Sequence, residues 1–278
     1  MKLFISCDME GVSGVVAHDD TKPTTQAYER FRKVMTGEVN AAIAGASEGG
    51  FDEFLVNDSH NGMRNVLIEE LDPRAELISG STKPLCMMEG VDKGFDLAMY
   101  VGYHAMAGTA ASIMDHTFFG RMTHNIWING KRVGEAGINS GIAGYYGVPV
   151  GLITGDDKAV KQGRELHGDI EGVVVKYGID KFAARCLPLN TTRRMIQEGA
   201  KKAAQRRKDF KPLKYSSPVT FKIEFATAAE AAWARLIPLV KDAGPRIVTF
   251  TQDDYIDAFH LYLGVISLAG TMQDPVFG

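Results

Sequence analysis

Five side chains that make good metal ligands stand just beyond segments of the chain that are predicted to form buried strands or a hairpin. They are Asp8 and Glu10 after residues 3–7, His60 after residues 54–56, His104 after residues 97–101, and Glu135 after a hairpin at residues 125–133. In open α/β sheets, ligands bind at the carboxyl ends of the strands, where the connecting loops converge. We therefore expect these five side chains to meet at one edge of a sheet.

The chemistry of this set favours a pair of divalent ions. Imidazole nitrogens and carboxylate oxygens suit Zn²⁺, with Mn²⁺ or Co²⁺ as alternatives. Three carboxylates exceed the needs of one divalent ion, whereas two ions about 3.5–4 Å apart and bridged by a carboxylate would use them all. Asp8 is the expected bridge, because Glu10 can then cap the second ion. Asn57 and Asp58, which precede His60, are expected to orient the imidazoles.

Residue types and spacing leave other functions open. The ligands are dispersed and form no compact motif such as HExxH, and an isolated loop carboxylate or histidine is often only solvated or structural. Metal pairs serve acyl and phosphoryl transfer alike. The alternatives are therefore another amidase, a phosphoester hydrolase, or a non-catalytic peptide- or metal-binding protein. A phosphate-handling site should carry Arg or Lys beside the ligands, and none of the ligand motifs includes one.

The elements that must position these residues alternate between strand and helix in the first half of the chain. Apolar residues recur three or four apart over residues 27–47, which predicts an amphipathic helix between the strands at 3–7 and 54–56. Further strands are predicted at 76–78, 97–101 and 148–153, with a Gly-rich helix at 138–146 and a helix opened by Asp156 and Asp157. This order predicts an α/β fold with a mainly parallel sheet and flanking helices. Asn129-Gly130 predicts a hairpin turn.

The pattern changes after Lys211-Pro212-Leu213. Strands at 219–225 and 247–250 each lead into a helix, at 228–239 and 253–268. We expect a metal-binding catalytic α/β domain at residues 1–212 and a smaller α+β unit at residues 213–278 packed on it.

Composition and charge indicate the cellular compartment and argue against some classes of partner. The chain has 278 residues, 45% of them hydrophobic, and a formal net charge of -3, so nothing favours nucleic acid as a partner. It contains no apolar stretch of about 18 residues, so no membrane span is expected, and its N-terminus lacks the pattern of a signal peptide. Its three cysteines are widely spaced, which suits free thiols in a reducing compartment. We expect a cytoplasmic protein.

A set of short motifs resembles the D-aminopeptidase family, the M55 metallopeptidases, across nearly the whole chain. The matching pieces are Asp8-Met9-Glu10-Gly11-Val12-Ser13-Gly14, Val56-Asn57-Asp58-Ser59-His60, Glu89-Gly90, Gly102-Tyr103-His104-Ala105, Val133-Gly134-Glu135, Ala143-Gly144-Tyr145-Tyr146 and Gly155-Asp156-Asp157. The C-terminal part matches more loosely, through Ile223-Glu224-Phe225-Ala226 and Trp233-Ala234.

The resemblance implies two Zn²⁺ per subunit, held by Asp8, Glu10, His60, His104 and Glu135. It adds His116, in Met114-Asp115-His116-Thr117, as the catalytic histidine, which spacing alone does not single out. Its role as nucleophile, proton shuttle or oxyanion stabiliser is left open. The resemblance further implies an aminopeptidase that removes D-configured N-terminal residues from short peptides, and a homo-oligomer such as a decameric ring.

Overall fold

The computed structural model describes residues 1–272, and the chain divides into two compact units. Unit 1 comprises Met1–Ala105, Thr109–Met114 and Ile142–Leu213. Unit 2 comprises Met106–Gly108, Asp115–Gly141 and the chain from Lys214 onward. No helix in the described part of the chain has the length and apolar character that a membrane span requires.

Unit 1 is built on a seven-stranded sheet in the order β3-β2-β1-β4-β7-β8-β9. All neighbouring strands in it are parallel except β8 and β9. The mainly parallel α/β fold predicted from the sequence is thus confirmed. The strands are β1 (Lys2–Cys7), β2 (Glu53–Asp58), β3 (Ala75–Ile78), β4 (Leu97–Tyr103), β7 (Val150–Asp156), β8 (Glu171–Asp180) and β9 (Ala183–Cys186).

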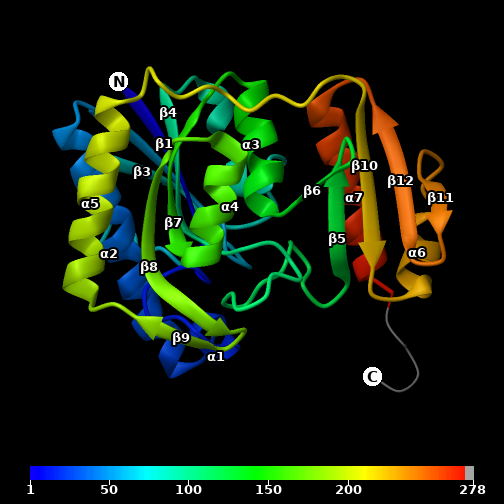
Figure 1. Cartoon of the computed structure of the whole chain (residues 1–278), viewed down its shortest axis with the longest axis horizontal. Coiled ribbons are helices and arrows are strands. Elements are labelled where there is room, and N and C mark those ends of the chain that lie inside the picture. The colour runs from blue at the N-terminus through cyan, green and yellow to red at the C-terminus, as the bar shows by residue number, and fades with distance from the viewer. Residues whose placement is uncertain (273–278) are drawn as a thin grey trace. The chain divides into compact units, whose positions relative to one another are not determined.

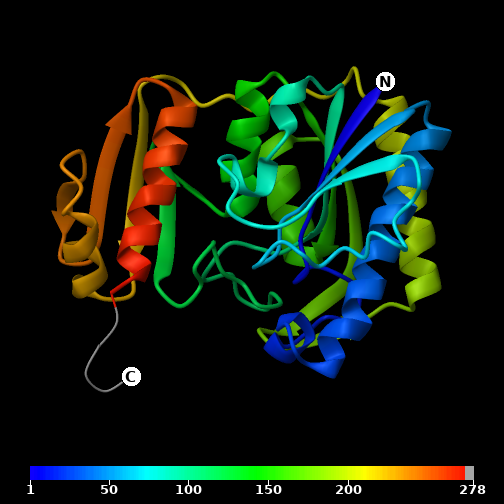
Figure 2. The same ribbon diagram turned by 180° about the vertical axis from the view of Figure 1, so that it is seen from behind.

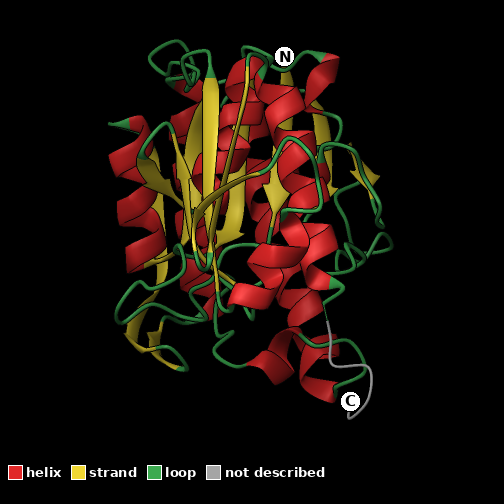
Figure 3. Cartoon of the chain, turned by 90° about the vertical axis from the view of Figure 1, so that its right-hand side faces the viewer, coloured by secondary structure: helices red, strands yellow, loops and turns green. Residues whose placement is uncertain are grey.

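Helices cover both faces of this sheet (Figure 1). Figure 3 distinguishes the helices and strands of the whole chain by colour. The long helices α2 (Gln26–Glu48) and α5 (Leu189–Gln205) pack against each other on one face, and α4 (Asp157–His167) packs on β7 and β8 on the other. Val39 of α2 and Ile196 of α5 are completely buried in the resulting apolar core, where each such side chain contributes about 1.5–3 kcal/mol. The short elements of the unit are α1 (His18–Thr21) and the 3₁₀ turns η1 (Cys86–Met88) and η2 (Val91–Lys93).

The carboxyl ends of β1 and β4 approach unusually closely. Asp8 N donates to Val101 O and Gly11 N donates to Gly102 O, each at 2.8 Å. Gly102 has a φ of +74°, and a Cβ atom built on it would lie 2.2 Å from the carbonyl oxygen of Asp8. Only glycine fits this position, and its absent side chain lets the residues that follow the two strands lie side by side.

Unit 2 is an antiparallel sheet in the order β11-β12-β10-β5-β6, with two helices packed on one face of it (Figure 2). Val219, Phe221, Ile223 and Phe225 of the central strand alternate with half-buried polar residues and point into its core. The elements are β5 (Thr123–Ile128), β6 (Lys131–Val133), β10 (Val219–Phe225), β11 (Lys241–Gly244), β12 (Ile247–Gln252), α6 (Ala228–Ala234) and α7 (Tyr255–Gly270). Helix α3 (Glu135–Tyr145) begins in unit 2 and ends in unit 1.

The chain crosses from one unit to the other at a point next to the expected domain boundary. The chain leaves unit 1 for unit 2 between Leu213 and Lys214, beside the expected boundary at 212. Unit 2 also takes in Asp115–Gly141, because the predicted hairpin at Asn129-Gly130 forms β5 and β6, and β5 pairs with β10. The assignment of residues 1–212 as the catalytic domain stays a prediction, and residues 273–278 of the expected unit 213–278 lie outside the described residues.

The close approach at Gly102 yields a stability prediction. Gly102→Ala should lower the free energy of unfolding by about 2–5 kcal/mol, because it adds a collision with Asp8 to the strain of a left-handed backbone. Gly147→Ala is the matched control in unit 1, since Gly147 has a φ of +79° and a Cβ atom added to it would meet nothing within 4 Å; it should cost only about 1–2 kcal/mol. Urea unfolding of both variants measures the difference, and equal losses would contradict the steric argument.

Candidate metal centre

Four of the predicted ligands lie together in unit 1, at the carboxyl ends of three neighbouring strands. Asp8 and Glu10 follow β1, His60 follows β2, and His104 follows β4. The Nδ1 atom of His60 lies 2.9 Å from Glu10 Oε2 and 3.4 Å from Asp8 Oδ1, and the Nε2 atom of His104 lies 3.3 Å from Asp8 Oδ2. All four residues are buried, with at most 7% of their surface exposed. Burial of so many ionisable groups in one place is typical of a functional site.

Each imidazole is oriented by a backbone carbonyl. His60 Nε2 lies 3.2 Å from Thr21 O, and His104 Nδ1 lies 3.0 Å from Ala105 O. A carbonyl oxygen only accepts, so the ring nitrogen that faces it must carry the proton. The other nitrogen, His60 Nδ1 or His104 Nε2, is then the one that can bind a metal, and it faces the carboxylates in both residues. This is the arrangement in which metal-binding histidines are usually held.

Asp58 does not orient the imidazoles, contrary to the expectation from its place beside His60. Its carboxylate accepts hydrogen bonds from Asn65 N at 2.5 Å and from Val66 N at 2.7 Å. Asn57 likewise accepts from Lys83 Nζ at 2.7 Å. These side chains fix the loops around β2, because buried backbone N–H groups need partners, while the carbonyls of Thr21 and Ala105 orient the rings. A backbone carbonyl carries no residue signature, so the sequence could not have identified these two.

The carboxylates determine the protonation of His60 in the metal-free site. Burial by itself lowers the pKa of His60, but Glu10 and Asp8 outweigh it through charge and hydrogen bonding and hold that pKa well above its ordinary value. The metal-free protein therefore keeps a proton between the imidazole and the carboxylates, at the position that a cation would take.

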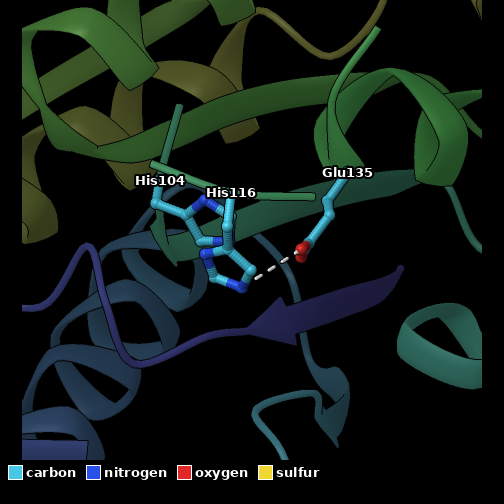
Figure 4. Close-up of side chains that lie close together, drawn as sticks. All are labelled: His104, His116 and Glu135. Carbon is cyan, nitrogen blue, oxygen red and sulfur yellow. Dashed lines mark ion pairs between the residues drawn. The ribbon is translucent and has the colours of Figure 1, made fainter. Parts of the chain in front are cut away.

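The two other predicted site residues, His116 and Glu135, lie together in unit 2. The Nε2 atom of His116 is 3.6 Å from Glu135 Oε1, and Figure 4 shows the imidazole directed at this carboxylate. Glu135 is the first residue of α3, where the helix dipole favours a negative charge, and its Oε1 accepts a hydrogen bond from Phe118 N at 2.6 Å. Glu135 is buried, whereas the side chain of His116 is 23% exposed. A histidine held by a carboxylate and open to solvent is suited to proton transfer.

The comparisons with known proteins agree with one another. The family model described as D-aminopeptidase, peptidase M55, matches residues 1–263. The chain is 40% identical over 270 residues to the D-aminopeptidase of Bacillus subtilis (strain 168), which covers 97% of this chain and 98% of that protein. It also resembles the solved structure of DppA from Bacillus subtilis, described as a Zn-dependent D-aminopeptidase and a self-compartmentalizing protease. The TM-score is 0.95 and the identity 38%, covering 99% of this chain and 100% of that one.

The protonation of His60 yields a prediction about metal binding. A divalent metal must displace the proton of His60, whose raised pKa keeps it bound at neutral pH, so binding should release a proton. Metal affinity should consequently fall as the pH is lowered, by about tenfold per pH unit for each proton displaced. Calorimetric zinc titrations in buffers of different ionisation enthalpy count the released protons, and the variant His260→Ala serves as the control. Zinc binding independent of pH between about pH 6 and 8 would contradict this account.

Proposed function

The chain belongs to the D-aminopeptidase family of peptidases, M55, and from that membership we propose that it removes D-configured N-terminal residues from short peptides with two zinc ions. The observation that carries the metal pair is the orientation of Asp8. Its Oδ1 atom faces His60 Nδ1 at 3.4 Å, and its Oδ2 atom faces His104 Nε2 at 3.3 Å. One carboxylate that turns its two oxygens to two different imidazoles is suited to bridge two metal ions.

The residues that would hold the zinc ions are Asp8, Glu10, His60, His104 and Glu135, with Asp8 suited to contact both ions. The donors are nitrogen and oxygen atoms, which is the set that zinc takes in catalytic sites and that also accepts Mn²⁺ or Co²⁺. The buried carboxylates add support, because they supply the negative charge that two divalent cations need. Glu135 joins the set because it is a carboxylate donor within a family motif, at a helix start that favours negative charge.

The reaction follows from the chemistry of these groups. A zinc pair, when bound, supplies an activated water and polarises the scissile carbonyl. His116 transfers a proton to the departing amine nitrogen, and its partial exposure makes it accessible to a substrate. The carboxylate of Glu135 at 3.6 Å stabilises the imidazolium form of His116 before that transfer.

Phosphoester hydrolysis is the weaker alternative, because Lys83, a lysine near the proposed ligand His60, already has hydrogen-bond partners in the protein. Lys83 Nζ donates to Asn57 Oδ1 at 2.7 Å and to Asp58 O at 2.6 Å. A cation that binds a transferring phosphoryl group must present its donors to the substrate. The amide hydrolase therefore fits better than the phosphatase.

The proposal extends to a homo-oligomer, with a decameric ring as its most specific form. Its support is the relative described as a self-compartmentalizing protease, together with the high similarity over the whole length of both chains. Sedimentation velocity would test it, and a monomer of about 30.3 kDa at all concentrations would exclude it. The cytoplasm is the proposed compartment, since Cys7, Cys86 and Cys186 form no disulfide; cell fractionation checks that assignment.

The substrate proposal predicts stereoselective, metal-dependent cleavage. The zinc-loaded protein should hydrolyse D-Ala-D-Ala, and chelator-stripped protein should not until zinc is restored. The matched dipeptide L-Ala-L-Ala is the control and should be cleaved far more slowly. Equal cleavage of both would leave the metal centre standing and refute the preference for D-residues, and cleavage that survives chelation would refute the metal proposal.

The proposed roles predict different outcomes for ligand and proton-transfer variants. Asp8→Ala and His60→Ala should lose bound zinc and activity together, because each removes a donor from the centre. His116→Ala should keep its zinc and lose about 10²–10⁴-fold in kcat, the usual contribution of a general acid or base. Metal content by atomic spectroscopy, measured beside kcat, separates the two classes. Full activity in His116→Ala would remove this residue from the mechanism.

A further inference from the structure

A lysine lies completely buried behind the loop that carries Glu10. Lys176 is on β8 and has no exposed surface, the only lysine or arginine of residues 1–272 that is buried in this way. Transferring an ammonium group into a protein interior is strongly unfavourable unless its charge and its donors are matched. Such a group needs a specific reason for its place, and nothing in the proposed reaction uses Lys176.

All three donors of Lys176 are directed at backbone carbonyls of one short loop. Its Nζ atom donates to Glu10 O, to Val12 O at 2.9 Å and to Val15 O at 2.6 Å. A protonated lysine has three N–H donors and no acceptor, so three carbonyls match the ammonium form completely. The loop at residues 10–15 is thereby drawn around a single positive charge.

The same loop is also hydrogen-bonded to side chains of the helices α2 and α5. Glu38 of α2 is buried and accepts a hydrogen bond from Ser13 N at 3.0 Å, and Ser13 Oγ donates to Thr192 Oγ1 of α5 at 2.9 Å. Carbonyls of the loop thus accept hydrogen bonds from a cation, and an N–H group of the loop donates to a buried carboxyl group. The loop is fixed to β8, α2 and α5 rather than to its own neighbours alone.

We propose that Lys176 is a positioning residue for the metal centre: it fixes the backbone of residues 10–15 so that the Glu10 carboxylate stays beside His60. The bond from Lys176 reaches the carbonyl of Glu10 itself, and the side chain of that residue lies 2.9 Å from His60 Nδ1. Loss of the lysine removes this donor from the carbonyls of Glu10 and Val15 and leaves Val12 O only the hydrogen bond from Val15 N at 3.2 Å, so the loop must move to find other partners. A movement of about 1 Å is enough to spoil a metal ligand. This inference rests on the proposed function of Glu10 as a ligand.

The test compares Lys176→Met, which keeps the length of the side chain and removes all donors, with Lys176→Gln, which keeps an amide donor. Amide hydrogen exchange of residues 10–15 in metal-free protein measures the order of the loop, and calorimetry measures zinc affinity at a temperature where every variant is folded. Lys176→Met should exchange faster at these residues and bind zinc about 10- to 100-fold more weakly, as for other groups that orient metal ligands. The exchange rate and the zinc affinity of Lys176→Gln should lie between those of Lys176→Met and the wild type. If Lys176→Met fails to fold, Lys176→Gln decides the test.

Phe51→Leu is the control for a general loss of stability. Phe51 is buried at the opposite, amino-terminal end of β1, where Asp52 N donates to Met1 O at 3.2 Å. This variant should melt at a lower temperature yet keep wild-type zinc affinity and wild-type exchange at residues 10–15. Wild-type zinc affinity in Lys176→Met would overturn the proposal and leave the lysine a purely structural group. Absence of zinc binding by the wild type would refute the proposed function instead. The exchange data would then still show whether Lys176 fixes the backbone of residues 10–15.

Discussion

Unit 1 buries several carboxylates, and its structure depends on the groups that compensate the cost of taking them out of water. Asp8 and Glu10 are 2% and 6% exposed, and Glu38 and Asp156 lie buried close by. Buried charges are tolerated only when they are paired, hydrogen-bonded or bound to metal. The histidines, the backbone N–H groups and the buried ammonium meet that demand in the metal-free chain. Burial lowers the pKa of Lys176 to about 8, against the opposing influence of Asp156 and Glu38, so most of it stays charged at neutral pH.

Strand ends proved to be the most informative feature of the sequence. Short apolar runs followed by Asp, Glu or His predicted where Asp8, His60 and His104 lie, because side chains after neighbouring parallel strands must share one edge of the sheet. Their service as zinc ligands is still a proposal. His116 could be named only from the family resemblance, since a histidine in an irregular segment has no periodicity to mark it.

Other parts of the fold could not be predicted from patterns in the sequence. The strands β8 and β9 had no prediction, although β8 carries Lys176, because a lysine inside an apolar run argues against a buried strand until its partners are known. The pairing of β5 with β10 joins residues nearly a hundred positions apart, such as Ile126 and Ile223. Local turn chemistry predicts a hairpin but carries no information on which distant strand completes its sheet.

The order of strands in unit 2 has a consequence for synthesis on the ribosome. The β5–β6 hairpin leaves the ribosome long before β10, the strand that lies between it and β12. An isolated hairpin is only marginally stable, and at roughly 5–20 residues per second it waits on the order of 5–20 seconds for that strand. The segments bearing His116 and Glu135 are thus anchored last, whereas a nascent chain can already gather Asp8, Glu10, His60 and His104. With the roles proposed for these residues, zinc binding would precede the completion of the unit that carries His116.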